Sequence, residues 1–405
     1  MRAIVVGAGL AGLAAADALA AAGHEVSVLE ARDRVGGRAW SRRLENGALV
    51  EMGAEFLLPG NTVIRELAAR LGLGLWDTGM RYGTREPRGV DELPAEALEE
   101  AVAAMDAALS ADPEAGRVPA RRFLDGLEIH DAARQVILAR LEVSCADSAD
   151  VVLAESLMGV AHFDDEPAPS VAGGNQGLAT GLAAGLGDAV RLGAAVRRVA
   201  WAEDGVTVGG PWGELSADSC VVAVPATTIA EISFEPALPE ALGAALREIP
   251  YGQAAKLFVP LREPPEPSAV LSVPERYWAW TATGEGDLPQ PVLSAFAGSP
   301  GALERLEVAA GPERWLASLR ELRPDLELDE EGAVLSTWSD DPWARAAYSS
   351  ALSAAATEIL RGAYGPLRFA GEHTAGEFSG LMEGALRSGR RAARGLGPRG
   401  TRAPG

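Results

Sequence analysis

The chain contains few cysteines and few basic residues relative to acidic ones, and its cysteines do not have the spacing of metal ligands. Its two cysteines, Cys145 and Cys220, form no CxxC pair, so we expect neither a disulfide framework nor a metal site, and a reducing cytoplasm as the location. Lys and Arg number 36 against 57 Asp and Glu, which gives a net charge of -21. This balance argues against a nucleic-acid partner, because phosphate binding relies on clustered basic side chains. An acidic surface or a cationic substrate is compatible with it.

No apolar stretch approaches the roughly 20 residues that span a bilayer, so we expect no membrane anchor. The N-terminal segment resembles a signal peptide, with one arginine, an apolar run and small residues. However, Gly7, Gly9 and Gly12 interrupt that run, and HEVSVLEAR completes a folded unit after it. We therefore expect this segment to belong to the mature structure.

The same segment has the pattern of a β-α-β unit. AIVV at 3–6 is a short apolar strand, an alanine-rich helix covers about 10–22, and EVSVLE forms a second strand that ends at Glu30. Such a unit begins a doubly wound parallel sheet, so the predicted fold class is α/β. Further along, residues 84–165 have a helical, charged pattern, whereas 236–330 mix several strands with a helix near 312–322.

The turn inside the β-α-β unit reads Gly7-Ala8-Gly9-Leu10-Ala11-Gly12, a G-x-G-x-x-G motif. Gly7 permits the tight turn, Gly9 lets a pyrophosphate approach the backbone, and Gly12 allows the helix to pack closely on the strand. The helix N-terminus adds free N–H groups and a partial positive charge. Glu30 lies where a carboxylate accepts ribose hydroxyls. These features predict a bound dinucleotide without distinguishing FAD from NAD.

A second glycine turn follows directly, in EARDRVGGR at 30–38. With these residues the sequence resembles the flavin-containing amine oxidase family, which includes monoamine and polyamine oxidases, L-amino-acid oxidases and histone lysine demethylases. FAGEHTAGEFSGLMEGALRSG at 369–389 and the segment from Gly173 to Pro225 carry the same resemblance. It implies a single FAD, held non-covalently, with Glu30 on the adenosine ribose and Arg38 near the pyrophosphate.

The resemblance also implies where further residues meet FAD. Glu372 is expected near the ribityl or pyrophosphate portion, Met382 begins a closing helix whose N–H faces the flavin, and the backbone of Val196 meets adenine. For Arg32 a solvated surface charge remains an alternative. The residues assigned to the cofactor are Gly7, Gly9, Gly12, Glu30, Ala31, Arg32, Gly37, Arg38, Gly53, Ala54, Glu55, Val196, Trp338, Gly371, Glu372, Gly380, Leu381 and Met382.

On the substrate side, Lys256 lies in the middle of an apolar strand, where a lysine is costly without a purpose. The family has a lysine here that holds a water over flavin N5; a strand lysine reaching solvent is the alternative. Tyr348 and Phe56 match aromatic positions of the substrate cage and tunnel. The assigned catalytic residues are therefore Lys256, Tyr348, Leu381 and Phe56.

Three positions depart from the family pattern. Leu381 replaces an aromatic residue of the cage, which allows a bulkier or differently shaped substrate. Ala347 occupies the position at which some monoamine oxidases carry a flavin-linking cysteine, and Leu58 lies near the tunnel glutamate of some polyamine oxidases. An acidic run after His162 (Asp164, Asp165 and Glu166) would suit a second ammonium or a solvated loop.

The resemblance implies two domains between which the chain crosses several times. A Rossmann-like FAD-binding domain with a β-meander takes 1–75, 167–235 and 328–396. A substrate-binding α+β domain takes 76–166 and 236–327, and 397–405 form a flexible tail. The expected function is oxidation of a small amine to an imine by hydride transfer to FAD, with O2 reduced to H2O2, in a monomer or homodimer. A desaturase or dehydrogenase of the same fold and a non-catalytic flavin scaffold are the alternatives.

Overall fold

The predicted N-terminal β-α-β unit is present. In the computed structural model, which describes residues 1–81, 83–160, 167–350 and 352–396, β1 (Arg2–Val6) leads through a glycine turn into α1 (Leu10–Ala21) and β2 (Glu25–Leu29). With β8 (Val190–Arg191), β12 (Ser219–Val222) and β19 (Leu367–Phe369), these strands form a parallel sheet in the order β19-β12-β1-β2-β8. The α/β fold with a doubly wound parallel sheet is thus confirmed.

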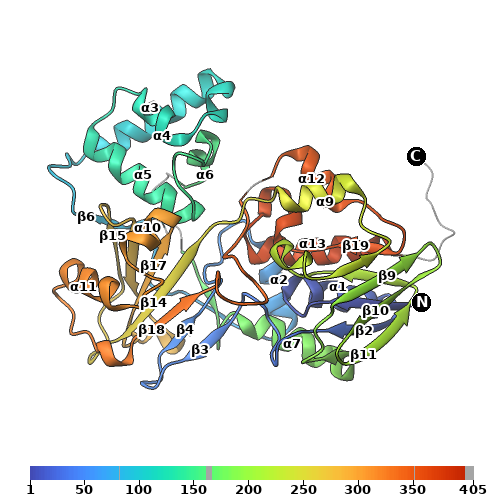
Figure 1. Ribbon diagram of the computed structural model, residues 1–405. Helices are drawn as coiled ribbons and strands as arrows, with labels where there is room; N and C mark the ends of the chain where they lie inside the picture. Colours follow the sequence, from blue (N-terminus) through green and yellow to red (C-terminus); the bar gives the residue numbers. More distant parts are fainter. Residues whose placement is uncertain (82, 161–166, 351, 397–405) are drawn as a thin grey trace.

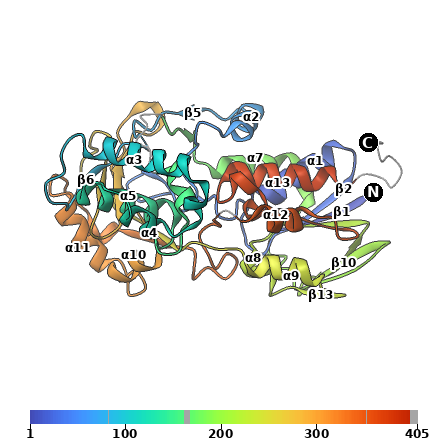
Figure 2. The same cartoon turned by 90° about the horizontal axis from the view of Figure 1, so that it is seen from above.

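Both faces of this sheet are covered, as the alternation of apolar side chains along β1 requires. Ala3 and Val5 pack with α1, with α7 (Gln176–Leu186) and with α13 (Met382–Arg394). Ile4 and Val6 pack instead against the meander strands. Figure 2 shows the three helices on one side of β1 and β2 and strands β10 and β13 on the other.

The meander is a second, four-stranded sheet in the order β11-β10-β9-β13. Its strands are β9 (Arg198–Ala202), β10 (Gly205–Gly210), β11 (Gly213–Ala217) and β13 (Ser233–Glu235). Val199, Val206 and Val208 face the parallel sheet and bury its second face. Pairing begins at Val190 in β8 and at Arg198 in β9.

A six-stranded sheet forms the other half of the molecule, in the order β18-β14-β17-β16-β15-β6 (Figure 1). Its strands are β6 (Glu86–Arg88), β14 (Ala254–Pro260), β15 (Ser268–Ser272), β16 (Tyr277–Thr281), β17 (Val292–Gly298) and β18 (Val334–Thr337). Ala255, Leu257 and Val259 pack with the helix α11 (Glu313–Leu322). Alternation along β14 therefore directs Lys256 and Phe258 to the opposite face.

Helices predicted for 84–165 lie over this sheet (Figure 1). They are α3 (Ala97–Ala111), α4 (Ala120–Asp125), α5 (Asp131–Cys145) and α6 (Leu157–Val160), and they share one apolar core. At the start of 84–165, where a helical pattern was predicted, β6 forms an edge strand of the six-stranded sheet instead. Pro87 suits this position, since an edge strand does not need every backbone N–H.

Shorter elements complete the two halves and the segments between them. They are the strands β3 (Ser41–Arg43), β4 (Leu49–Glu51), β5 (Leu75–Trp76) and β7 (Ser170–Val171), the helices α2 (Thr62–Arg70), α8 (Ala226–Ile229), α9 (Glu240–Arg247), α10 (Pro300–Arg305) and α12 (Ala354–Arg361), and the 3₁₀ turns η1 (Pro113–Arg117), η2 (Ala154–Ser156), η3 (Gly187–Ala189), η4 (Glu285–Asp287), η5 (Glu330–Gly332), η6 (Glu372–Thr374) and η7 (Gly376–Phe378). Among the described residues no helix is long and apolar enough to cross a membrane. The predicted tail at 397–405 and the acidic run Asp164, Asp165 and Glu166 lie outside the described residues.

Candidate active site

One cavity of about 660 Å³ extends from the β1–α1 turn to the six-stranded sheet. At one end it is lined by Gly7, Gly9 and Glu30, and at the other by Trp278 and Trp280. The cavity thus joins the carboxyl edge of a parallel sheet, where ligands of such sheets bind, to a chamber on a different sheet.

The glycine turn has the geometry that the motif predicts. Gly7 has φ +100°, in the region that favours glycine. Gly9 is the N-cap of α1 without a side-chain cap, and a Cβ there would point into open space beside the cavity. A Cβ on Gly12 would collide with the carbonyl oxygen of Gly7. The turn therefore leaves uncovered backbone N–H groups at the cavity.

Glu30 lies at the end of β2 and is 4% exposed. Its Oε2 accepts a 2.7 Å hydrogen bond from the backbone N–H of Ala8, and its Oε1 accepts one of 2.9 Å from Arg32. Each carboxylate oxygen retains a further acceptor site toward the cavity. Val196 and Ala31 line the same end, while the Arg32 guanidinium lies 2.6 Å from Asp341.

Glu372 joins three distant segments in the middle of the cavity. Its carboxylate pairs with Arg38 at 3.1 Å and accepts hydrogen bonds from the Ser349 hydroxyl and from the Gly380 N–H at 2.8 Å. Burial by itself raises the pKa of Glu372, but Arg38, His373 and these donors together lower it below its usual value. The carboxylate is therefore ionised at neutral pH and fixes Arg38 beside the 347–349 segment.

His373, next to Glu372, is 1% exposed and lines the cavity. Burial lowers its pKa to about 4, so the ring is neutral at physiological pH. Neither ring nitrogen has a hydrogen-bond partner among the described residues. Both nitrogens are themselves buried, so His373 is an unsatisfied polar group behind the cavity wall.

The first turn of α13 faces the cavity. Met382 begins the helix after the N-cap Leu381, no side chain caps this end, and both residues line the cavity. Glu383, also in the first turn, is directed elsewhere: its carboxylate accepts the N–H groups of Val63 and Ile64, each at 3.0 Å, at the start of α2. The partial positive charge of α13 therefore remains available to an anionic group in the cavity.

Gly53, Ala54 and Glu55 line the cavity opposite α13 and are held by a residue that sequence analysis missed. Asn175, which is fully buried, donates its side-chain amide to the carbonyls of Ala54 and Glu55 at 3.1 and 2.6 Å. Its own N–H donates to Glu51 at 2.7 Å. A sequence signal existed, because Asn175 precedes a helix where a polar cap residue is common.

Lys256 is 7% exposed and lines the cavity. Its Nζ donates to the Glu55 carboxylate at 2.6 Å and to the carbonyl oxygen of Glu51 at 2.9 Å. An ammonium has three donors, so one more is available beyond these two. The structure therefore places Lys256 inside the cavity, and the alternative of a strand lysine that reaches solvent is wrong.

Below Glu55, the Glu51 carboxylate is buried next to the start of α7. Burial raises its pKa to about 7, although the N–H of Asn175 and the hydroxyl of Ser41 act in the opposite direction. Lys256 also lowers this pKa and Glu55 raises it. Three ionisable side chains are thus coupled through one small space beside the cavity.

Aromatic side chains form the substrate end. Phe56 lies with its ring centroid 5.6 Å from the rings of both Trp278 and Trp280, and these two rings stack at 4.1 Å. Phe296, opposite both Lys256 and Trp278 in the strand register, completes this wall. Sequence analysis missed Trp278, Trp280 and Phe296, although the alternation in YWAWTA already placed the two tryptophans on one face.

Tyr348 and Leu381 line the same chamber. Tyr348 lies in the loop between β18 and α12. Its hydroxyl donates to the carbonyl oxygen of Ser144 at 3.0 Å, which directs the ring toward the end of α5. Gly380, with φ +78°, lies between them, and a Cβ there would approach the Tyr348 ring within 3.4 Å. Trp338 donates its indole N–H to the carbonyl of Met52 at 3.1 Å and packs against Gly53.

The arrangement fits FAD. An elongated cavity with a glycine turn and an acidic ribose site at one end suits the adenosine and pyrophosphate, and an uncapped helix N-terminus beside an aromatic chamber suits a flat ring that becomes anionic on reduction. Among the described residues no group of His, Cys, Asp or Glu side chains could hold a metal ion.

Comparison with known proteins gives the family. The model for "Flavin containing amine oxidoreductase" matches residues 10–144 and 80–396. The putrescine oxidase of Kocuria rosea is 31% identical over 96% of this chain and 94% of its own length. Polyamine oxidase 4 of Oryza sativa subsp. japonica is 28% identical over 96% and 87%. A structure of putrescine oxidase bound to putrescine superposes with a TM-score of 0.82 at 25% identity, covering 98% of this chain and 99% of that one.

These matches span both halves of the molecule, and the family resemblance noted in the sequence is confirmed. They also favour amine oxidation over the desaturase and scaffold alternatives. The chain belongs to the flavin-containing amine oxidoreductase family and is an FAD-dependent enzyme that oxidises amines.

Proposed function

We propose that the chain oxidises monoamines with a bulky apolar substituent, such as an aryl-alkyl or cycloalkyl group, and that O2 is the electron acceptor. The observation that supports this substrate class is the chamber wall. Phe56, Trp278, Trp280 and Phe296 form one continuous aromatic surface at the end of the cavity. Such a surface favours apolar substituents through burial of their area.

The carboxylates that line the cavity are engaged elsewhere or lie at its opening. Glu55 pairs with Lys256, and Glu372 pairs with Arg38. Glu155, Glu231 and Glu377 are exposed, and Asp147 is half-buried. Glu30 lies at the opposite end, beside the glycine turn. No carboxylate among the described residues is therefore placed to receive a second ammonium inside the aromatic chamber. The mouth carboxylates would instead attract a cationic amine toward the opening.

Bound FAD would supply an acceptor for the hydride of the carbon that bears the amine nitrogen and a route for the electrons to O2, which would yield H2O2. Tyr348 and Leu381 orient the amine in the chamber, and Phe56 contacts its substituent. The apolar walls favour the neutral amine because burial disfavours ammonium. Lys256 holds a water through its third N–H donor, and the N-terminus of α13 stabilises negative charge on the ring.

We further propose that FAD is held non-covalently. Ala347 offers no nucleophile beside Tyr348, Cys220 is buried in β12, and burial raises the pKa of Cys145 to about 12. Two free cysteines also suit a reducing cytoplasm. The assembly is a monomer or homodimer.

The proposed FAD-binding part comprises 1–75, 167–235 and the segment after β18, and the proposed substrate-binding part comprises 76–166 and 236–337. The chain returns to the FAD-binding part after residue 337, which is later than the return at residue 328 expected from the sequence. β18 pairs with β14, so it shares the sheet that carries Lys256 and the tryptophans. A boundary through a sheet is unfavourable because it would divide a hydrogen-bonded ladder.

Anaerobic reduction of the bound flavin by a panel of amines tests the proposal. Cycloalkyl and aryl-alkyl monoamines should bleach the yellow colour at least about ten-fold faster than putrescine or spermidine, because a buried polar group without a partner is strongly disfavoured. Air should then return the colour with one equivalent of H2O2. Faster reduction by putrescine would contradict the substrate class. Reduction by hydrocarbon-like donors alone would favour a desaturase, and no reduction by any donor would favour a scaffold.

A further inference from the structure

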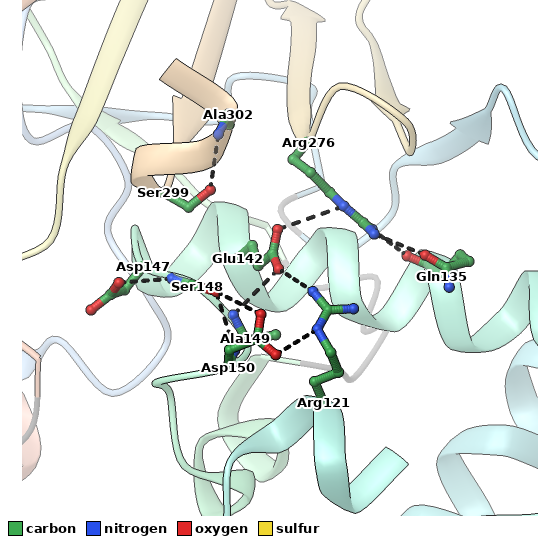
Figure 3. Close-up of polar contacts among 10 residues, drawn as sticks. All are labelled: Arg121, Gln135, Glu142, Asp147, Ser148, Ala149, Asp150, Arg276, Ser299 and Ala302. Atoms are coloured by element: carbon green, nitrogen blue, oxygen red, sulfur yellow. Dashed lines mark hydrogen bonds and ion pairs between the residues drawn. The ribbon is translucent and has the colours of Figure 1, made fainter. Parts of the chain in front are cut away.

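Glu142, on helix α5, is a buried carboxylate outside the cavity lining. It is 6% exposed and contacts three different segments, as Figure 3 shows. Its Oε1 lies 3.0 Å from Arg121 and 3.3 Å from the backbone N–H of Ala149, and its Oε2 lies 3.6 Å from Arg276. A buried carboxylate shared by two arginines is costly to assemble and is disrupted by loss of any partner.

The first connection holds the segment that follows α5. Arg121, on α4, bridges Glu142 and the Asp150 carboxylate, which lies 2.8 Å from its Nε. The backbone N–H of Arg121 also donates to the carbonyl of Ala149 at 3.0 Å, and Ala120 donates to Val152 at 2.8 Å. Residues 148–152 are therefore fixed to α4 on several sides.

The second connection holds the strand that carries the tryptophans. Arg276 lies in the turn between β15 and β16, two residues before Trp278, and has φ +59°. Besides Glu142 it donates to the backbone carbonyl and side-chain oxygen of Gln135 at 2.7 and 2.8 Å, both on α5. Figure 3 shows this guanidinium extending from the β15–β16 turn to the helix. Helix α5 and the start of β16 are thus joined along two turns of the helix.

These two connections meet at the cavity. Val143, Ser144 and Cys145, in the last turn of α5, line it, as do Asp147 and Val151–Leu153 in the following segment. The carbonyl of Ser144 accepts the Tyr348 hydroxyl, and the carbonyl of Ala146 accepts the N–H of Gln253 at 2.9 Å. The end of α5 therefore forms the chamber wall that faces the tryptophan-bearing sheet.

We propose that Glu142 is a positioning residue that sets the width of the amine chamber by fixing the last turn of α5 and residues 147–153 relative to strand β16. This inference rests on the chamber assigned under the proposed function. Glu142 itself does not contact the amine. It acts through Ser144, which holds Tyr348, and through Arg276, which precedes Trp278.

The charges explain why the carboxylate matters more than its volume. Arg121 and Arg276 both approach Glu142, and their side chains are 32% and 11% exposed. In Glu142→Gln the two guanidiniums lose the charge that holds them together, and they repel each other at short range. Arg121 retains Asp150 and Arg276 retains Gln135, so we expect the wall to separate from the sheet while the fold persists.

The experiment compares the holoenzyme with Glu142→Gln and Glu142→Asp in two readouts. For a bulky monoamine such as 2-phenylethylamine, Glu142→Gln should raise KM about ten-fold and change kcat less than about three-fold, because a wider chamber weakens contact with the substituent equally in the ground state and the transition state. The second readout is alkylation of Cys145 by N-ethylmaleimide, followed by peptide mapping. It should become about ten-fold faster as the helix end opens, while the buried Cys220 stays unlabelled. Glu142→Asp should retain the charge and restore both values in part.

Two further variants keep the test decisive. Glu114→Gln removes an exposed ion pair of the same helical region and should leave both readouts unchanged. Asp150→Asn removes the charge that pairs with Arg121 at a 63% exposed side chain, which also accepts the Ser148 hydroxyl at 3.2 Å. It should move both readouts about two- to three-fold. It decides the question if Glu142→Gln does not fold. Folded Glu142→Gln or Asp150→Asn enzyme with wild-type KM and labelling rate overturns the inference. Wild-type enzyme that oxidises no bulky monoamine overturns the proposed function instead, whatever the labelling shows.

Discussion

The two ends of the cavity are built in different ways. The end that fits the adenosine is assembled mostly within the first 40 residues, where the glycine turn, Glu30 and Arg38 follow one another along the chain, and Val196 completes it. The amine chamber takes Phe56, Tyr348 and Leu381 from loops and the tryptophans from the six-stranded sheet. A contiguous motif can bind a cofactor of fixed shape. The shape of a chamber made of separate segments, in contrast, changes when any one segment changes. The difference predicts that damage at the first end removes the cofactor, and that damage at the second alters rates and selectivity.

The largest effect is expected from Gly12→Val at the cofactor end. Its side chain would collide with the carbonyl oxygen of Gly7, so the turn or helix α1 must move. Overpacking of this kind costs about 1–3 kcal/mol or more, and we expect FAD content to fall at least about ten-fold. The ratio of flavin to protein absorbance measures it. Gly60→Ala, where a Cβ has open space, is the matched control, and full flavin content in Gly12→Val would contradict the assignment.

A stability effect nearly as large is expected from Glu51→Gln, between the two ends. Because burial raises its pKa from 4.5 to about 7, the folded protein binds a proton there that the unfolded chain releases. The neutral form of Glu51 contributes about 3 kcal/mol to the free energy of unfolding. This contribution is complete below pH 4.5 and is lost as the pH rises to about 7. Relative to Glu51→Gln, wild-type protein should therefore lose stability between these pH values.

The comparison with the variant is needed because His373 acts in the opposite direction. Its lowered pKa of about 4 favours folding above pH 6.5 and removes that stability as the pH falls. The two effects offset each other in wild-type holoprotein, which should have a flat profile between pH 4.5 and 6.5. Unfolding midpoints measured at pH 5 and pH 7.5 separate them. Parallel profiles for wild type and Glu51→Gln would show that Glu51 titrates normally.

At the chamber end, Lys256→Met should retain FAD and lower kcat for amine oxidation about a hundred-fold, the scale of a lost proton-handling group. The methionine keeps the length of the side chain, but it leaves the Glu55 carboxylate without its 2.6 Å partner. Lys256→Arg, which keeps the charge, should retain more activity. Stopped-flow flavin reduction gives the rate, and a loss of flavin from Lys256→Met would assign this lysine to cofactor binding instead.

The smallest effect is a change of preference. Leu381→Tyr restores an aromatic residue opposite Tyr348 and narrows the chamber, and Trp280→Ala widens it. We expect Leu381→Tyr to raise KM for cyclohexylamine about ten-fold and to spare slender alkylamines, since a few buried methylenes have this effect on selectivity. Trp280→Ala should weaken binding of all aryl-alkyl amines. Equal shifts for slender and bulky amines in Leu381→Tyr would show that position 381 does not determine chamber shape.

Sequence patterns predicted the cofactor end of the cavity because the residues that indicate it are close together in the chain. Alternating apolar residues in β1 and β2, the spacing of the three glycines and the position of Glu30 each depend on neighbours within a few residues. The family, the fold class and FAD as cofactor are confirmed, whereas the roles of individual residues stay predictions. Patterns also indicated helices after residue 84 but not the strand β6, because pairing with β15 is a long-range contact.

The sequence predicted only some of the residues that line the chamber. Lys256, Tyr348, Leu381 and Phe56 were assigned through resemblance, while Trp278, Trp280 and Phe296 were not. Nothing within YWAWTA or VLSAFA indicates which face of the sheet is turned to the cavity, since both faces carry apolar residues. Asn175 and Glu142 were missed for a related reason, because their partners Glu51, Ala54, Arg121 and Arg276 lie far away in the chain.

By itself the sequence determined that residues 2–30 form a dinucleotide-binding unit, because a glycine turn, a helix start and an acidic strand end act through the backbone nearby. FAD rather than NAD followed from the resemblance to the family. Only the tertiary structure decided what surrounds the amine. Segments that are remote in the chain converge there, and their side chains acquire a common surface, shared ion pairs and shifted pKa values only when packed together.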